Sequence, residues 1–201
     1  MSSSILRILL SGHDSNDEAQ RAEELATLLQ TESILNLRGN RIGAEGAAVL
    51  ATCLQTNRTL TSLNLTNSCI GDEGARALGT CLQTNNTLTS LDLQCSEIGD
   101  EGAEAVATAL QTNQTLISLD LSFCDIHVRG IKALIDALKT KNTLTTLGLS
   151  GNDMADEMMG DEEAKAVAIA LRDNQSLTSL DLQRSRVSDK GAKVLARALH
   201  S

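Results

Sequence analysis

"LTSLNLTNSCIGDEGARALGTCLQTN", residues 60–85, decides the fold because it predicts one strand, one turn and one helix in succession. Its first half follows the spacing L-x-x-L-x-L, and the alternation of apolar and polar residues is typical of a short strand with one buried face. The three leucines should therefore face a core. The residues between and beside them should face water, namely Ser62, Asn64 and Thr66.

The second half of the stretch predicts a turn and a helix. Gly71 can adopt a left-handed turn that other residues resist, and Asp72 is placed to cap the helix that follows. Asn85 is expected to end that helix in a left-handed conformation. One stripe along the helix is apolar and should face the strand, and it consists of Ala75, Leu78, Cys81 and Leu82.

Nearly the same phrase occurs five times in the 201 residues, beginning at residues 54, 82, 110, 138 and 171. This self-similarity indicates a stacked repeat. Because each strand is followed by the same helix, the strands should run parallel with right-handed crossovers. Strands pack about 4.8 Å apart and helices about 8–10 Å apart, so the stack must bend. We expect an α/β solenoid of about seven repeats, a horseshoe segment with parallel strands on its concave face and helices on its convex face.

The repeated spacing L-x-x-L-x-L-x-x-(N/C/S)-x-I-G-x-x-G-A resembles the leucine-rich repeats of the ribonuclease-inhibitor type, over residues 34–201. Such repeats also occur in NOD-like receptors, in the GTPase-activating protein of Ran and in bacterial effectors that act inside host cells. The resemblance implies a leucine-rich-repeat solenoid. It also implies a ladder position that satisfies buried backbone groups between repeats, at Asn40, Ser68, Ser96, Cys124, Asn152 and Ser185.

Three regions depart from this spacing. Residues 1–33 are expected to form a degenerate first repeat that caps the amino-terminal end, with ILRILL as its strand. An acidic insertion at residues 153–163 is either a solvated loop or a docking loop for a basic partner. The last repeat ends without a separate cap, so the polar face of a helix at 190–199, self-association or further chain could cover it. We expect a monomer, with self-association through this end as the alternative.

The composition excludes several classes of partner. The net charge of −9, with no basic run and one aromatic residue, argues against nucleic acid and anionic membranes. The sequence contains no run of about 18 apolar residues that could span a bilayer, and the first residues are too weakly apolar for a secretory signal. The five cysteines lack metal-ligand spacing and are interpreted as small buried residues in a reducing compartment. We therefore expect a cytoplasmic protein without cofactor or metal.

No group of residues predicts catalysis. His13, His127 and His200 have no Cys, Ser or paired carboxylate placed beside them by local spacing, and His127 is interpreted as a substitute at a turn position usually held by Gly. N-x-S/T sequons at Asn57, Asn64, Asn85, Asn113 and Asn174 are interpreted as repeated turn and strand chemistry rather than glycosylation sites. The protein is predicted not to be an enzyme.

The candidate site is the concave face, which at about 30 Å is wide enough for a protein interface of standard size. Three aspartates should form a mildly acidic column there, which is either a partner surface or a solvated sheet face. Phe123 is either an exposed anchor or partly buried against the neighbouring turn. Small residues such as Ser122, Gly148 and Ser150 should also face solvent. The candidate partner-binding residues are Arg38, Asn64, Asp92, Gln94, Asp120, Phe123, Asp181, Gln183 and Arg184.

The leading hypothesis is a non-enzymatic protein-recognition module that binds a protein partner on this concave face. The resemblance to bacterial effectors would place it in the cytosol of a host cell. The alternative is a regulator of the GTPase-activating or ubiquitin-ligase adaptor type, in which this chain is the targeting half. A third hypothesis is a structural array whose binding surface is weak.

Overall fold

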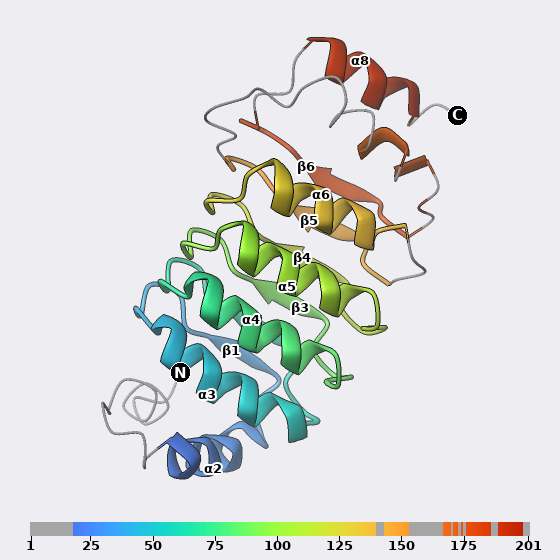
Figure 1. Cartoon of the computed structure of the whole chain (residues 1–201). Helices are drawn as coiled ribbons and strands as arrows, with labels where there is room; N and C mark the ends of the chain where they lie inside the picture. The colour runs from blue at the N-terminus through green and yellow to red at the C-terminus, as the bar shows by residue number, and fades with distance from the viewer. Residues whose placement is uncertain are drawn as a thin grey trace.

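The computed structural model describes residues 18–139, 143–152, 167–169, 171–172, 174, 176–185 and 189–198, in which short strands alternate with helices (Figure 1). The predicted amino-terminal strand and the acidic insertion lie outside these residues. The helices are α2 (Glu18–Leu29), α3 (Gly43–Thr56), α4 (Gly71–Leu82), α5 (Asp100–Leu110), α6 (Val128–Ala137) and α8 (Asp189–Ala198). The strands are β1 (Ile34–Asn36), β2 (Ser62–Asn64), β3 (Ser90–Asp92), β4 (Ser118–Asp120), β5 (Thr146–Gly148) and β6 (Ser179–Asp181).

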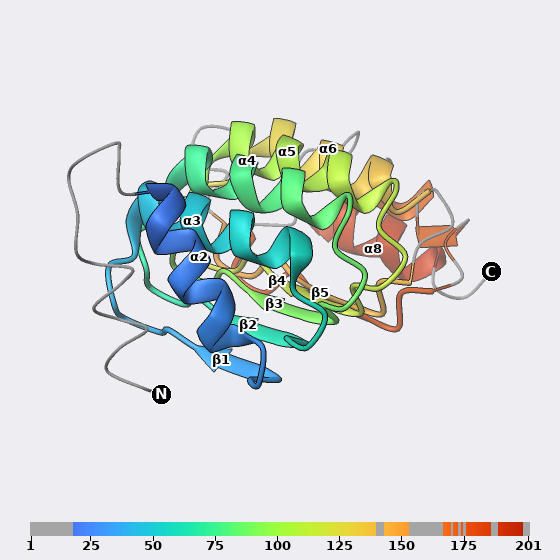
Figure 2. The same cartoon turned by 90° about the horizontal axis from the view of Figure 1, so that it is seen from below.

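The six strands form one parallel sheet in the order in which they follow along the chain. Their central leucines pair with one another in register, from Leu35 in β1 to Leu180 in β6. Figure 2 shows the helices stacked on one side of this sheet, with the strands side by side beneath them. The predicted α/β solenoid is therefore confirmed, with strands on the concave face and helices on the convex face.

The core is a row of similar layers between the sheet and the helices. In the repeat that starts at Leu60, each of the three leucines of the strand segment is at most 1% exposed. The predicted apolar stripe of α4 is also confirmed, since all four of its residues are at most 2% exposed. A Cβ at Gly79 would lie 2.9 Å from the Ala105 carbonyl oxygen, so glycine allows α4 and α5 to approach closely.

Four residues predicted to face solvent are instead buried. Each strand is only three residues long, so the alternation of inward and outward side chains ends sooner than expected. Thr66, Ser122 and Ser150 follow their strands and are at most 6% exposed, and Ser150 donates its N–H to Ser122 Oγ at 3.2 Å. Gly148 is buried because the Asp120 side chain lies over it.

Asp72 caps the next helix rather than its own, contrary to the prediction. Its Oδ1 accepts hydrogen bonds from the Gly99 N–H at 2.7 Å and the Gly102 N–H at 2.9 Å, at the start of α5. Asp100 makes the same two bonds to the repeat that follows. A Cβ at Gly102 would lie 2.8 Å from Asp72 Oδ1, so the close approach needs glycine. These carboxylates thus join successive repeats at helix N-termini, where negative charge is favourable.

The turn before each helix does not always need glycine. Gly71 has the predicted left-handed backbone, with φ of 63°. Gly99 and His127 occupy equivalent positions before α5 and α6, and both are extended, with φ of −96° and −99°. His127 therefore replaces glycine at a position whose backbone conformation any residue can adopt.

The recurrent Asn of the phrase L-Q-T-N forms a ladder between repeats. Asn85 does not adopt the predicted left-handed conformation, and its side chain is 2% exposed. Its Nδ2 donates to the Leu54 carbonyl of the preceding repeat at 2.7 Å, and its Oδ1 accepts from the Leu88 N–H at 2.8 Å. Equivalent bonds to the preceding repeat are made by Asn57, Asn113 and Asn174. Each amide therefore satisfies buried backbone groups that side-chain removal would leave unpaired.

The ladder implied by the resemblance is also present, at the turn after each strand. Its side chains donate to a carbonyl oxygen of the preceding repeat at 2.9–3.4 Å. Asn40 differs, because its Nδ2 donates to the Arg38 carbonyl within its own turn. The residues that bridge two repeats are Ser68, Ser96, Cys124, Asn152 and Ser185.

Candidate functional site

The register of the sheet aligns equivalent residues of successive repeats into columns across the concave face. We call the column at the last residue of each strand the acidic column. A second column, three residues further on, has a positive φ in every repeat, and we call it the left-handed column. The acidic column contains Asn36, Asn64, Asp92, Asp120, Gly148 and Asp181. The left-handed column contains Gly39, Asn67, Cys95, Phe123, Gly151 and Arg184.

Side chains of the acidic column hold the turn that follows each strand. Asp92, Asp120 and Asp181 each accept, through Oδ1, the N–H two residues further along the chain, at 2.8–3.1 Å. Asn64 makes the same bond to the Thr66 N–H at 2.9 Å, and its Nδ2 donates to Asp92 Oδ2 at 3.0 Å. An amide can therefore replace a carboxylate here without loss of the turn bond. The column has a structural role whether or not a partner binds.

The negative charge of the column is not neutralised within the described part of the chain, where none of its three aspartates forms an ion pair. Asp92 and Asp120 are directly opposite each other in β3 and β4. A Cβ at Gly148 would lie 2.5 Å from Asp120 Oδ1, so Asp120 extends over the adjacent backbone of β5. The column therefore presents like charges on neighbouring strands, about 4.8 Å apart, which attract a cation.

Phe123 lies in the left-handed column at the end of β4, where its φ is 54°. A positive φ is unusual for a bulky residue and costs on the order of 1 kcal/mol or more. The ring covers Gly151, since a Cβ there would lie 2.4 Å from Phe123 Cδ1, and the guanidinium of Arg184 is 5.9 Å from the ring centroid. The ring is nevertheless 41% exposed. One ring edge is therefore packed against the neighbouring turn and the rest is open, and the role of Phe123 as an anchor stays a prediction.

The structure brings some of the predicted residues together and separates others. Asn64, Asp92 and Asp120 lie on three adjacent strands, and Phe123 contacts Arg184. Asp181 lies in β6, where Gly148 of β5 separates it from Asp120. The other three residues lie in the column two places after each strand, where buried serines or a threonine separate them, and they are Arg38, Gln94 and Gln183. The predicted set is therefore a surface centred on β3 and β4 rather than one pocket.

Ile117 belongs to this surface and was not predicted. It is 45% exposed and lies immediately before β4. Equivalent threonines, such as Thr61 and Thr89, donate their hydroxyls to the carbonyl of the preceding repeat at 3.0 Å. An isoleucine cannot make this bond. The signal in the sequence is the apolar residue in a column of threonines, "TLISL" where the preceding repeat reads "TLTSL" and the following repeat reads "TLTTL".

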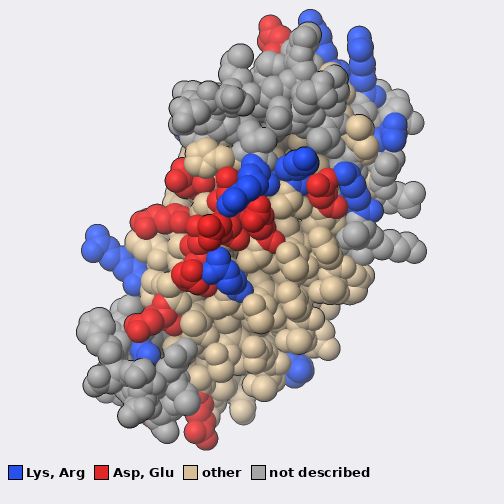
Figure 3. Space-filling view, viewed as in Figure 1, with Lys and Arg blue, Asp and Glu red and all other residues tan. Residues whose placement is uncertain are grey.

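The convex face has a different character. Figure 3, viewed from the helix side, shows acidic and basic side chains gathered over the middle of the array. There Arg76 pairs with Glu73 and Glu101, and Arg129 pairs with Glu104 at 3.1 Å and Asp100 at 3.8 Å. These exposed pairs bridge α4, α5 and α6, and their two guanidinium groups offset part of the charge of four carboxylates. Exposed pairs of this kind contribute little to stability.

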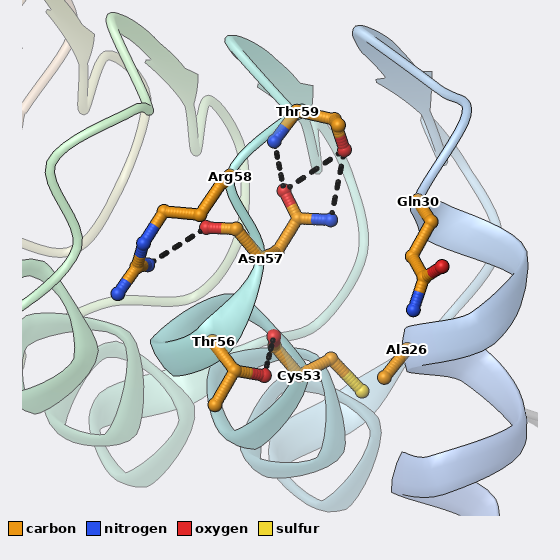
Figure 4. Close-up of a pocket in the computed structure, with 7 residues that line it drawn as sticks. All are labelled: Ala26, Gln30, Cys53, Thr56, Asn57, Arg58 and Thr59. Atoms are coloured by element: carbon orange, nitrogen blue, oxygen red, sulfur yellow. Dashed lines mark hydrogen bonds between the residues drawn. The ribbon is translucent and has the colours of Figure 1, made fainter.

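A pocket of about 330 Å³ lies between the ends of α2 and α3 (Figure 4). The Cys53 side chain extends towards Ala26, and its thiol donates to the Ala22 carbonyl at 3.0 Å. Burial raises the pKa of this thiol to about 12, so it stays protonated and is a poor nucleophile. The pocket contains no predicted site residue. Its lining consists of Ala26, Gln30, Cys53, Thr56, Asn57, Arg58 and Thr59.

The five thiols are free, as expected, although Cys69 and Cys95 are partly exposed rather than buried. In the part of the chain that the structure describes, no group of three or more His, Cys, Asp and Glu residues is arranged to hold a metal ion. The described helices also include none that is long and apolar enough to cross a membrane.

Comparison with known proteins agrees with this architecture. A family model described as "Leucine Rich repeat" matches residues 33–51, 56–79, 84–107, 112–134, 140–157 and 173–196. The solved structure of leiomodin-1 actin-binding site 2 is similar, with a TM-score of 0.60, 24% identity, and coverage of 78% of this chain and 90% of that one. The tropomodulin C-terminal domain of Caenorhabditis elegans has a TM-score of 0.60, 12% identity and 92% coverage of both chains. At these identities the similarity shows the fold. No curated protein matches the chain.

Proposed function

Because the chain belongs to the leucine-rich repeat family, we propose that it is a protein-recognition module that binds a protein partner on its concave face. In this proposal the module is not an enzyme. The ribonuclease-inhibitor type of repeat and a cytoplasmic location belong to the same proposal. Free thiols favour such a location, because disulfides are rare in reducing compartments.

The observation that carries the proposal is the contrast between the two faces. Charges on the convex face are paired with one another, as in the contacts of Arg76 and Arg129. Among the residues that the structure describes, the aspartates of the acidic column are in no such pair, and two exposed apolar side chains, Ile117 and Phe123, flank the concave strand β4. Hot spots of protein interfaces combine apolar anchors with surrounding polar contacts. The concave face therefore combines apolar side chains with charge that no described cation pairs with, which supports its choice as the interface.

Capture experiments from cytosolic extract can test the choice of face. In Asp120→Asn/Asp181→Asn each amide can keep the bond to the N–H two residues on, as Asn64 does, while the charge is lost. The matched control is Glu101→Gln/Glu104→Gln, which removes two charges from the convex face. We expect the first variant to capture the partner at least fivefold less than wild type and the control to capture it equally. Loss of capture only in the control would refute the proposal.

Actin is one specific candidate partner, supported by the structural similarity to leiomodin-1 actin-binding site 2. Co-sedimentation with filamentous actin, and gel filtration with monomeric actin, test it directly. Binding to either form that decreases in Asp120→Asn/Asp181→Asn would identify actin as the ligand of the concave face. Absence of binding of both forms, with actin in large excess over the chain, would remove actin from consideration.

Two further roles fit a recognition module. In a host cell, a bacterial effector could use this face to bind a host protein. As a regulator, the chain could serve as the targeting half of a GTPase-activating protein or a ubiquitin-ligase adaptor. Accelerated GTP hydrolysis by a small GTPase in the presence of the isolated chain would favour the regulator. Unchanged hydrolysis, together with capture through the concave face, would favour a module that only binds.

A further inference from the structure

Given the proposed function, we propose that the docking centre of the concave face is the strand β4 with its two flanking residues. This centre takes an extended partner segment that carries basic residues between two apolar residues. It consists of Ile117, Asp120 and Phe123, and we call these residues the β4 triad. Ile117 immediately precedes β4, Asp120 is the last residue of β4, and Phe123 lies in the turn that follows.

Ile117 is explained by neither the fold nor the stability of its repeat. Thr61, Thr89, Thr145 and Thr178 occupy its column, and each donates its hydroxyl to the carbonyl of the preceding repeat at 3.0–3.3 Å. The side chain of Ile117 has no hydroxyl and cannot make that bond. Its side chain is instead 45% exposed, so it gains little from burial. Ile117 thus exposes apolar surface within hydrogen-bonding positions, and this surface is available to a partner.

Phe123 is the aromatic residue of the left-handed column, which also contains Cys95 and Arg184. The left-handed backbone at this position suits Gly or Asn, which occupy it as Gly39, Asn67 and Gly151. Phe123 is held there by Gly151 and Arg184, yet 41% of its surface stays open. Aromatic side chains that are fixed by their neighbours and partly exposed are favoured as interface anchors. Ile117 and Phe123 belong to the same repeat and flank β4.

Asp120 supplies the charge between these two apolar groups. Its Oδ1 accepts the Ser122 N–H at 2.8 Å, and its neighbour in β5 is Gly148, which has no side chain to cover it. Asp92 lies opposite it in β3, so two carboxylates on adjacent strands face the same region. A guanidinium or ammonium group is the complement of this charge. The occupant is therefore basic at its centre and apolar at its ends.

The spacing of the occupant follows from the geometry of an extended chain. Ile117 and Phe123 are six residues apart, and because the chain turns after Asp120 their separation is below the about 20 Å that six residues span when fully extended. Alternate side chains of an extended segment share one face. A partner segment of the form Leu-x-Arg-x-Arg-x-Leu places all four side chains on one face, with leucines at the two anchors and arginines over the carboxylates.

Fluorescence polarisation with labelled 15-residue peptides tests this inference on the full chain. The probe contains Leu-x-Arg-x-Arg-x-Leu, with Ser or Gln at each x. Two control peptides replace either the arginines by Glu or the leucines by Ser. We expect the probe to bind at least tenfold more tightly than either control, and its affinity to fall at least threefold between 50 and 300 mM salt, about the loss expected for a partly desolvated ion pair.

The variants replace each residue of the β4 triad by a residue that stands at the equivalent position of another repeat. These are Ile117→Thr, Asp120→Asn and Phe123→Asn, each of which introduces a residue that its own column already contains. Each should keep the circular dichroism spectrum of wild type and weaken binding of the probe at least fivefold. Cys95→Asn, in the left-handed column one strand away, should change binding less than twofold.

Two outcomes would overturn the inference: equal binding of the probe and both controls, or unchanged binding of the probe by Ile117→Thr and Phe123→Asn. If either outcome occurs while Asp120→Asn/Asp181→Asn captures less partner than wild type, the concave face remains the interface and only the placement of the docking centre on β4 is refuted. Loss of captured protein solely in the convex control would refute both the proposed function and this inference.

Discussion

Substitution of Asn85 by alanine tests whether the Asn ladder joins the repeats. Asn85 is 2% exposed and bridges the Leu54 carbonyl at 2.7 Å and the Leu88 N–H at 2.8 Å. Alanine leaves both backbone groups buried without these bonds. An unsatisfied buried group costs about 1–3 kcal/mol, so two of them should lower the free energy of unfolding by about 3 kcal/mol. For a chain of this size the melting temperature should fall by about 6–12 °C.

The matched control is Asn86→Ala, the adjacent residue, whose side chain is exposed. A surface substitution of this kind should change stability by at most about 0.5 kcal/mol. Urea unfolding followed by circular dichroism measures both variants, and the slope with urea shows whether the array still unfolds cooperatively. If Asn85→Ala were within about 0.5 kcal/mol of Asn86→Ala, the ladder would not hold the repeats together and the reasoning would be wrong.

Three further predictions concern the core. Thr66→Val should raise the free energy of unfolding by about 1 kcal/mol, because Thr66 Oγ1 is buried and has no hydrogen-bond partner in the described structure. A lower melting temperature than that of wild type would contradict this. Gly102→Ala should lower stability by about 2 kcal/mol in urea unfolding, since its Cβ would lie 2.7 Å from Ile98 Cγ2 and 2.8 Å from Asp72 Oδ1, and a neutral effect would show that the contact relaxes freely. Burial raises the pKa of Cys81 from 9.0 to about 11, so as pH rises the thiol loses its proton in the unfolded chain before it does so in the folded one. The free energy of unfolding should therefore fall between pH 9 and 11, by up to about 1.4 kcal/mol per pH unit for this thiol. Cys81→Ala should reduce that slope.

The periodic part of the fold could be predicted because it depends on residues close in sequence. Leu63, Leu65, Gly71 and the apolar stripe of α4 all occupy the predicted environments. Their positions follow from strand and helix periods within one repeat. The period itself then fixes the parallel sheet and its register, since each repeat must present the same surface to the next.

Interactions between repeats could not be predicted in this way. Asp72 was assigned to its own helix because a local pattern contains no information on a partner 30 residues away. Asn85 was assigned a backbone role for the same reason, whereas its side chain bridges two repeats. Thr66 was placed in solvent because the alternation was extended beyond a strand that ends after three residues. In each case the controlling contact lies in the next layer of the stack.

The positions of the candidate residues on the fold could be predicted in part, and their role in binding stays a prediction. The acidic column and the exposed ring of Phe123 follow from strand alternation and composition. Ile117 was missed because it lies just before the strand, outside the alternating positions. Ile117 is found by comparing equivalent positions of the repeats, because it is the apolar residue in a column of threonines. The left-handed backbone at Phe123 was also beyond prediction, because no local rule places a bulky residue there.

Amide hydrogen exchange of the full chain, with and without its captured partner, tests the central claim most directly. Binding to the concave face should slow exchange in β3, β4 and β5 and in the turns that follow them, with the largest effect between Ile117 and Phe123. Exchange in the exposed first turns of α4, α5 and α6 should stay unchanged. Slower exchange in those helices, with no change in the strands, would contradict the account.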